Sequence, residues 1–401
     1  MAHLDRDPGP GTRDLGKRTA AALVVALCAG EASGDLLGAG LLRALKAQRP
    51  DLRFVGIGGP AMRAEGLECW FDASELAVMG LVEVLRHLPR LLSLRRQFLA
   101  RLMALRPAVY VGIDAPDFNL GVAKRLKSGG LTTLHYVSPS IWAWRQGRAR
   151  TIGAAVDEVL CLFPFEPDLY AMHGGRARFV GHPFADEMPL EPDRAGARRV
   201  MGLPDGTPVL AILPGSRQSE ISRLADDFLA AAARFRARYP EWRCLCAAAN
   251  PAITSALRER IQRAGHQGIE VIEGRMRQVL AASDLVLAAS GTATLEVALS
   301  QRAQVVAYRI APLTYWIVRT FGLLEVAHYS LPNRLAGREI VPEITQDEVR
   351  PERLVAELEA WVGDPQRRED YLAQCRAIHA ELRRDASAQA AAAVLEYLPS
   401  C

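Results

Sequence analysis

Asp114 is the acidic side chain of this sequence that is best placed to act as a base. It directly follows the apolar run AVYVGI (108–113), within GIDAPDFN, so it stands at the carboxyl end of a predicted buried strand. A carboxylate there is partly desolvated, which tends to raise its pKa and suits it to proton abstraction. Pro116 should hold Ala115 extended, and Asp117 should cap the helix that follows. Capping by Asp114 itself is the alternative, in which it does no chemistry.

A glycine-rich turn, AGEASGD (29–35), ends the first predicted strand. Gly30 allows a tight turn, and Ser33 and Asp35 are candidates for capping the next helix. Glu31 is poorly placed for a phosphate, because both groups are negative, and it suits a sugar hydroxyl or an amine better. A packed strand-to-helix turn without any ligand is the alternative.

Aromatic and hydroxyl side chains gather in the segment HYVSPSIWAWR (135–145), which begins in another predicted strand. The members that follow the strand are Ser138, Ser140, Trp142, Trp144 and Arg145. Indole faces combined with hydroxyls suit a sugar or an acyl ligand. A tryptophan pair in a core between two domains is the alternative.

The segment LPGSRQSEI (213–221) has the character of a phosphate site. Gly215 and Ser216 expose backbone amides at the start of a predicted helix, and the Arg217 guanidinium can bond two phosphate oxygens at once. The segment therefore predicts binding of a phosphorylated ligand.

The segment ASGTATLE (289–296) repeats this pattern after another apolar strand. Ser290, Gly291 and Thr292 open a helix whose first amides can face an anion. Glu296 lies one turn further along the same face as Thr292, where it can accept both hydroxyls of a ribose. A solvated helix residue is the alternative for Glu296. Two such turns in one domain predict a nucleoside diphosphate linked to a second group.

Metal coordination of that diphosphate has no support in the sequence. The only D-x-D is Asp5-Arg6-Asp7, in a Pro- and Gly-rich leader, and the seven cysteines show no zinc spacing. We therefore expect no metal and no cofactor, and the scattered cysteines fit a reducing cytosol. Arg217 and the helix amides must then stabilise the leaving group.

Apolar strands alternate with helical patterns along almost the whole chain, which predicts an α/β fold with parallel sheets. The strands of the first series lie in 21–29, 53–58, 108–113, 131–137, 158–163 and 178–181, and those of the second in 209–213, 243–249, 269–272, 285–289 and 304–308. A proline-rich stretch separates the two series. The sequence therefore predicts two doubly wound Rossmann-like domains that face each other across a cleft.

The predicted organisation is a disordered leader (1–19), an N-terminal domain (20–185), a C-terminal domain (186–365) and a helical end (366–401). The Ala-rich end can pack across the domains or exchange with a second chain, which would make a homodimer.

The composition is that of an ordinary globular protein. Half of the 401 residues are apolar, 23% are charged and the net charge is +4, which argues against a disordered chain and a dedicated nucleic-acid-binding protein. No apolar run approaches the roughly 20 residues of a spanning helix.

The stretch 78–102 is apolar with interspersed arginines, namely Arg86, Arg90, Arg95, Arg96 and Arg101. It predicts either a core helix with a basic outer face or an amphipathic surface that binds anionic lipid.

In combination, these segments resemble the motifs of the lipid-A-disaccharide synthases, from about residue 20 to 398. The matching segments, in the family's order, are AGEASGD, VMGLVEVL, GIDAPDFN, HYVSPSIWAWR, LFPFEP, LPGSR, ASGTATLE and SLPNRLAGRE. The resemblance implies a glycosyltransferase-B fold, with an acceptor-binding first domain and a UDP-sugar-binding second domain.

The implied reaction is an inverting β-1,6 transfer without metal. The donor is UDP-2,3-diacylglucosamine, the acceptor is 2,3-diacylglucosamine 1-phosphate (lipid X), and the products are lipid A disaccharide 1-phosphate and UDP. The implied location is the cytoplasm, with the enzyme held peripherally on the anionic inner membrane, and nucleic acid is not an expected partner.

The resemblance also implies roles for individual residues. Asp114 matches the catalytic aspartate, and Arg217 and Asn333 match an essential arginine and asparagine at the donor side. The nucleotide-binding turn corresponds to Ser290, Gly291, Thr292 and Glu296, while Glu31, Ser33, Ser138, Trp142 and Arg145 would line the cleft. A nucleotide-sugar epimerase of the same fold and a non-catalytic nucleotide- or lipid-binding module remain alternative functions.

Overall fold

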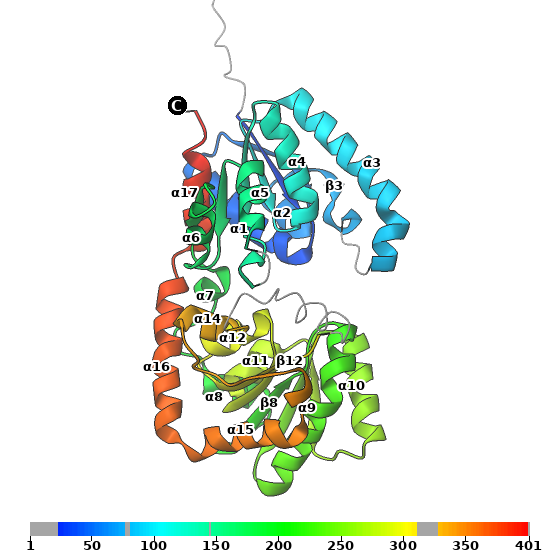
Figure 1. Cartoon of the computed structure of the whole chain (residues 1–401), viewed down its shortest axis with the longest axis vertical. Helices are drawn as coiled ribbons and strands as arrows, with labels where there is room; N and C mark the ends of the chain where they lie inside the picture. Colours follow the sequence, from blue (N-terminus) through cyan, green and yellow to red (C-terminus); the bar gives the residue numbers. More distant parts are fainter. Residues whose placement is uncertain (1–22, 77–80, 144–145, 311–327, 400–401) are drawn as a thin grey trace, which may run out of the picture.

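The computed structural model describes residues 23–76, 81–143, 146–310 and 328–399 (Figure 1). The expected leader (1–19) lies outside these ranges. Within them the chain forms two parallel sheets, one above the other in the view of Figure 1, each flanked by helices. This is the expected fold: α/β, with two Rossmann-like domains.

The first sheet has the strand order β3-β2-β1-β4-β5-β6-β7. Its strands are β1 (Val24–Ala29), β2 (Arg53–Gly58), β3 (Glu68–Asp72), β4 (Val109–Ile113), β5 (Thr132–Tyr136), β6 (Glu158–Cys161) and β7 (Ala177–Phe179). Its helices are α1 (Ala32–Gln48), α2 (Pro60–Ala64), α3 (Leu81–Leu105), α4 (Pro116–Ser128), α5 (Arg148–Ala155) and α6 (Glu166–Ala171), with short 3-10 turns at Ala73–Glu75 and Ile141–Ala143.

The second sheet has the order β10-β9-β8-β11-β12-β13. Its strands are β8 (Val209–Leu213), β9 (Arg243–Ala248), β10 (Ile269–Glu273), β11 (Leu285–Ala289), β12 (Ala303–Tyr308) and β13 (Glu343–Thr345). Its helices are α8 (Arg194–Val200), α9 (Gln218–Arg238), α10 (Pro251–Arg263), α11 (Met276–Ala282), α12 (Thr292–Leu299), α14 (Leu331–Ala336) and α15 (Pro351–Gly363), with a 3-10 turn at Gln346–Glu348.

Each sheet reverses its strand order at one place, between β1 and β4 in the first and between β8 and β11 in the second. In open parallel sheets, ligands bind beyond the carboxyl ends of the strands at such a switch point. The segments AGEASGD and GIDAPDFN follow β1 and β4, and LPGSR and ASGTATLE follow β8 and β11. The four candidate motifs therefore occupy the two switch points.

The carboxyl edges of the two sheets face each other. Leu295 of α12 and Leu331 of α14 belong to the same buried cluster as Ile141 and Trp142, which follow β5. The Arg334 guanidinium of α14 lies 4.8 Å from the ring centroid of Phe165, beyond the end of β6. Apolar and cation–π packing thus holds the two carboxyl edges opposite each other.

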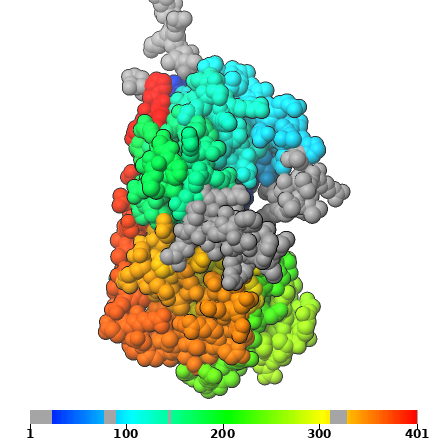
Figure 2. Space-filling view, in the orientation of Figure 1, coloured from blue at the N-terminus to red at the C-terminus, as the bar shows by residue number. Residues whose placement is uncertain are grey.

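The chain returns to the first domain at its end (Figure 1). Three helices make the connections: the short α7 (Pro183–Glu187), the long α16 (Pro365–Leu382) and α17 (Ala386–Leu395). Ala390, Ala391 and Val394 of α17 are buried against Leu41 and Leu45 of α1. Figure 2 shows the C-terminal segments running along one side of the molecule past both domains. The Ala-rich helix therefore buries its apolar face within its own chain.

Candidate functional site

Asp114 and Ala115 form an unusual turn at the end of β4. Both have left-handed backbone conformations, with φ of 50° and 42°, and the ψ of Ala115 is 57°. The expectation that Pro116 holds Ala115 extended is therefore wrong. Left-handed conformations are costly for residues other than glycine and persist only where surrounding contacts enforce them.

Asn119 supplies those contacts. It is fully buried, and its Nδ2 donates to the carbonyl oxygens of Asp114 at 2.8 Å and of Cys28 at 3.1 Å. The hydroxyl of Tyr110 donates to its Oδ1 at 2.8 Å. One amide thus ties the turn after β4 to the end of β1, which overrides the local preference of the residue before proline.

Gly30 allows the turn after β1 to approach the Asp114 turn. A Cβ added at Gly30 would lie 2.8 Å from the Cβ of Ala115, closer than real side chains approach. Glu31 and Ser33, which follow in this turn, are exposed at the same edge of the sheet. The structure therefore brings Glu31 and Ser33 to the same switch point as Asp114.

Asp35 has a different role from the expected one. It is buried and accepts hydrogen bonds from the backbone amides of Gly59 at 2.7 Å and Ala61 at 2.9 Å, at the start of α2. The helix after β1 begins already at Ala32, and no side chain of the described residues caps it. Asp35 therefore anchors α2 and is not available to cap its own helix.

The electrostatics of Asp114 suit a base. Burial raises its pKa, and a hydrogen bond with the backbone of Ala115 opposes the rise. Asp117, three residues on, is almost fully exposed and lies 3.9 Å from Arg148. Of the two aspartates in this segment, Asp114 alone is partly desolvated.

The segment after β5 packs between the domains. Ser138 is buried and shares a 2.9 Å hydrogen bond with the Tyr170 hydroxyl. Burial raises the pKa of the neighbouring Glu166 to about 8, and the hydrogen bond that its carboxylate accepts from the Phe163 amide, at 3.1 Å, opposes the rise. Trp142 is buried, with its ring 5.5 Å from that of Phe165.

These positions agree with the interdomain interpretation of the segment, and a substrate contact by Ser138 or Trp142 stays a prediction. Arg145 lies outside the described residues.

The second switch point holds a cavity of about 450 Å³. The seven residues expected there all line it: Gly215, Ser216, Arg217, Ser290, Gly291, Thr292 and Glu296. Its remaining walls come from Leu213, Glu220, Ala247, Ala248, Ala249, Gly274, Met276, Ala289 and Ala293. The volume is within the range of small-molecule sites. The contributions from the ends of β9 and β10 could not be predicted, because alanine and glycine side chains carry no functional group.

Glu220 already occupies the first of the two anion-binding turns. Its Oε2 accepts from the amide of Ser216 at 2.8 Å and from that of Arg217 at 3.3 Å. Gly215 has a φ of 129°, and a Cβ there would lie 2.5 Å from the Cβ of Glu220. The amides that we expected to bind a phosphate thus hold a carboxylate of the chain itself, while the Arg217 side chain is exposed at the cavity wall.

The second anion-binding turn differs. Gly291 is the N-cap of α12, and within the described parts of the chain no side chain caps this helix. The first amides of a helix have no partners in the helix itself, so those of Thr292 and Ala293 remain available at the cavity wall. Of the two anion-binding turns, the one at the start of α12 is therefore the better anion site.

Glu296 is largely buried beside these amides and pairs with an arginine that the sequence did not reveal. Its Oε2 accepts from the Nε of Arg277 at 2.9 Å. Burial raises the pKa of Glu296, and the hydrogen bond and charge of Arg277 oppose the rise. Arg277 comes from α11, and only the fold brings that helix to α12.

Asn333 is fully buried in α14, with both atoms of its amide engaged. Nδ2 donates to the carbonyl of Val341 at 2.9 Å and to Glu343 at 2.7 Å, and Oδ1 accepts from the amide of Ile340 at 2.7 Å. In this arrangement the Asn333 amide holds the segment 340–343. A role for Asn333 at the UDP-sugar donor stays a prediction.

Among the described residues, no group of three or more His, Cys, Asp or Glu side chains is arranged to hold a metal ion.

The two domains and their switch-point sites define a class of protein. Solved structures with this architecture include the UDP-GlcNAc 2-epimerase from Neisseria meningitidis bound to UDP-GlcNAc, with a TM-score of 0.64 and 9% identity over 93% of this chain and 99% of that one. Another is the glycotransferase of kitacinnamycin, with a TM-score of 0.60 and 17% identity over 94% and 99% of the two chains. The fold is thus that of glycosyltransferases of the B type and related epimerases.

Sequence similarity identifies the family. The family model described as lipid-A-disaccharide synthetase matches residues 25–397. The lipid-A-disaccharide synthase of Xanthomonas campestris pv. campestris (strain 8004) is 53% identical over 393 residues, which cover 98% of this chain and 88% of that protein. The chain belongs to the lipid-A-disaccharide synthase family and is a glycosyltransferase of lipid A disaccharide synthesis.

The hydrogen bonds of Asn119 with Tyr110, Cys28 and Asp114, here called the Asn119 clamp, lead to a prediction about stability. Asn119→Leu should lower the free energy of unfolding by about 2–4 kcal/mol, because carbonyls and the Tyr110 hydroxyl lose a buried partner. Tyr110→Phe removes one of these hydrogen bonds and should cost about 1 kcal/mol. Urea denaturation of the two variants measures the difference, and equal losses would contradict the clamp.

Proposed function

We propose that the enzyme transfers 2,3-diacylglucosamine from its UDP-linked form to the 6-hydroxyl of 2,3-diacylglucosamine 1-phosphate. The observation that carries this proposal is the cavity at the second switch point, where an uncapped helix start, Arg217 and Glu296 meet. It combines groups for a diphosphate and for a ribose in one space of suitable size.

The negative charge of the diphosphate determines where the UDP-sugar donor binds in this proposal. Its diphosphate lies at the amides of Thr292 and Ala293, where the helix dipole favours an anion, and the exposed Arg217 guanidinium reaches it from across the cavity. The carboxylate of Glu296 accepts the ribose hydroxyls. The carboxylate of Glu220 keeps its hydrogen bonds with the amides of Ser216 and Arg217 unless the diphosphate extends to the start of α9 and replaces it there.

The acceptor lies at the first switch point, beside Glu31, Ser33 and Asp114. Asp114 takes the proton of the 6-hydroxyl as that oxygen attacks the anomeric carbon of the donor from the face opposite the diphosphate. The bond from the anomeric carbon to the phosphate oxygen breaks and UDP departs, with its charge stabilised by Arg217 and the α12 amides. The attack inverts the anomeric centre and gives the β-1,6 linkage.

An epimerase of the same fold would use the nucleotide cavity without an acceptor, and a binding module would leave Asp114 without a task. Membership of the synthase family favours the transferase over both.

We also propose that the enzyme works on the anionic surface of the inner membrane, where its lipid substrates reside. Among the described residues, no helix is both long and apolar enough to span a bilayer. On α3, Arg90 and Arg96 are exposed, and so are Leu92 and Met103, at 42% and 38%. Cationic and apolar side chains together on one helix suit binding to an anionic lipid surface.

Asp114→Asn should lower the rate of transfer by about 10²- to 10⁴-fold and leave UDP affinity unchanged, since the base is lost and the nucleotide cavity is in the other domain. Asp117→Asn is the matched control and should transfer normally. In the wild-type enzyme, kcat/KM should fall as the pH falls through the raised pKa of Asp114, because the protonated carboxyl cannot accept a proton. The midpoint of that acid limb should lie above 3.8, the ordinary value for aspartate. An active Asp114→Asn enzyme would exclude this aspartate as the base.

Arg217→Ala should weaken UDP binding about tenfold or more, because a charge-assisted contact to the diphosphate is lost. Arg234→Ala removes the same charge further along α9, where Arg234 pairs with Glu352, and should leave UDP affinity unchanged. Isothermal titration calorimetry measures both. Equal UDP affinity in wild type and Arg217→Ala contradicts the assigned role.

Reversing the charges of α3 tests the membrane proposal. The double variant Arg90→Glu, Arg96→Glu should weaken binding to phosphatidylglycerol vesicles about thirtyfold or more in a co-sedimentation assay, since each basic residue near the surface contributes about 1 kcal/mol. Arg234→Glu in the second domain is the control. If vesicle binding survives the α3 reversal, the helix is only a structural element.

A further inference from the structure

We propose that Arg277 is the positioning residue that makes Glu296 select a ribonucleotide, an inference that rests on the proposed placement of the donor. Arg277 itself does not contact the nucleotide. It fixes the carboxylate that does.

Three contacts hold the Arg277 guanidinium. Its Nε donates to the Oε2 of Glu296 at 2.9 Å, and its Nη1 donates to the Oε2 of Glu187 in α7 at 3.0 Å. The ring of Phe184 packs against it, with 5.2 Å between the guanidinium carbon and the ring centroid. A planar group held on two edges and one face has little freedom to turn.

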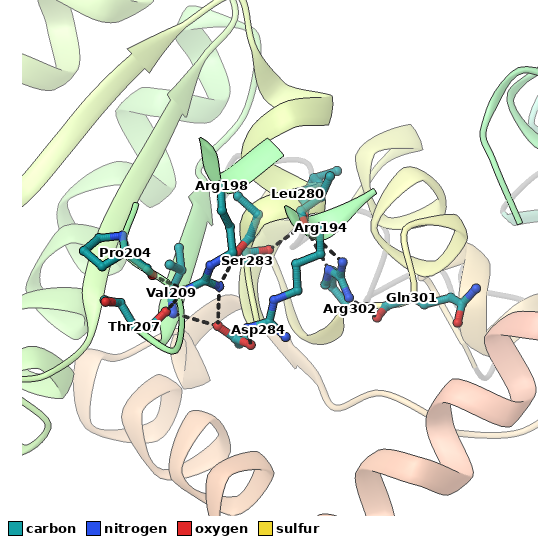
Figure 3. A network of polar contacts seen from close by, with 12 residues as sticks. Arg194, Arg198, Pro204, Thr207, Val209, Leu280, Ser283, Asp284, Gln301 and Arg302 are labelled. Atoms are coloured by element: carbon teal, nitrogen blue, oxygen red, sulfur yellow. Dashed lines mark hydrogen bonds and ion pairs between the residues drawn. The ribbon is translucent and has the colours of Figure 1, made fainter. Parts of the chain in front are cut away.

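The helix that carries Arg277 is anchored at its other end (Figure 3). Arg302 donates to the last carbonyls of α11, from Nε to Leu280 at 3.1 Å and from Nη2 to Ala281 at 2.9 Å. The largely buried Arg198 donates to the carbonyl of Ala282 at 3.1 Å. Cations at a helix C-terminus satisfy its free carbonyls and complement its dipole.

Asp284 connects the C-terminal end of α11 to the sheet. Asp284 lies at hydrogen-bond distance from Arg194, and its Oδ2 accepts from the amide of Val209 at 2.9 Å, at the start of β8 (Figure 3). Arg277 therefore projects from a short helix whose far end is bound to the rigid centre of the domain.

The fixed position of Arg277 determines the orientation of the Glu296 carboxylate. One of its oxygens is bonded to Arg277, and within the described ranges the other has no protein partner. The carboxylate is thus oriented in advance at the cavity wall, with its charge balanced, where two vicinal hydroxyls can donate to it. Without Arg277, a largely buried carboxylate loses its counter-charge and can rotate, so the advantage of a ribose over a deoxyribose disappears.

The test compares the affinities of UDP and 2′-deoxy-UDP by isothermal titration calorimetry. The wild-type enzyme should bind UDP about tenfold more tightly, because loss of the 2′-hydroxyl removes a hydrogen bond to a charged group. Glu296→Gln should reduce this ratio to about two or less, and Arg277→Ala should reduce it to the same extent. Arg277→Lys keeps a positive charge but lacks the planar fork, so its ratio should fall between those of wild type and Arg277→Ala.

Arg275→Ala is the matched control. Arg275 is exposed at the start of the same helix, and its loss changes the local charge equally without touching Glu296. It should weaken or preserve both affinities together and keep the ratio. Melting temperatures of all variants show whether each one is folded.

The outcomes separate the two levels of the proposal. If wild type binds no UDP, the placement of the donor is wrong and this inference falls with it. If wild type discriminates and Glu296→Gln does not, but both Arg277 variants keep the wild-type ratio, the donor site stands and the role of Arg277 is overturned.

Discussion

At the centre of each sheet, the helices that follow two neighbouring parallel strands lie on opposite faces of the sheet. This topology leaves a gap above the carboxyl ends of the two strands, where ligands bind in folds of this kind. In the first sheet, α1 packs with one face of β1 and α4 with the other. The four motifs AGEASGD, GIDAPDFN, LPGSR and ASGTATLE begin at these two gaps. The facing arrangement of the two carboxyl edges then turns two separate gaps into one reaction space. The strand order is thus the constraint on which the rest of the site depends.

Buried asparagines maintain the backbone around that space in both domains. Asn119 binds the ends of two strands of the first sheet together, and Asn333 binds the segment 340–343 beside the second. Each amide is fully enclosed and has both of its atoms engaged, so each fixes a local shape that its neighbours along the chain would not adopt alone. Each of these side chains therefore shapes the backbone at a sheet edge from within the core.

The sequence was sufficient for features that depend on local pattern. The alternation of apolar runs and helices predicts the two sheets, and glycine-rich turns after strands predict the switch-point motifs. It failed where partners come from distant segments. The extended conformation expected of Ala115 follows a sound local rule, but a hydrogen bond from Asn119 overrides it. Asp35 meets the start of α2, and Arg277 meets Glu296, only because the chain folds back. The hydrogen bond from the Ser216 amide to Glu220 could not be predicted either, since sequence pattern does not show which anion binds at a helix start.

The return of α17 to the first domain has a consequence for synthesis on the ribosome. Leu41, Leu42 and Leu45 of α1 belong to the apolar cluster that α17 completes, yet α17 emerges only after the entire second domain. At about 5–20 residues per second, roughly 200 intervening residues take about 10–40 s to make. Over that interval the apolar surface of α1 lacks its partner α17, while the strands of the second domain are being made. The first domain therefore acquires its full apolar core only after the second domain has been synthesised, although its own strands are made first.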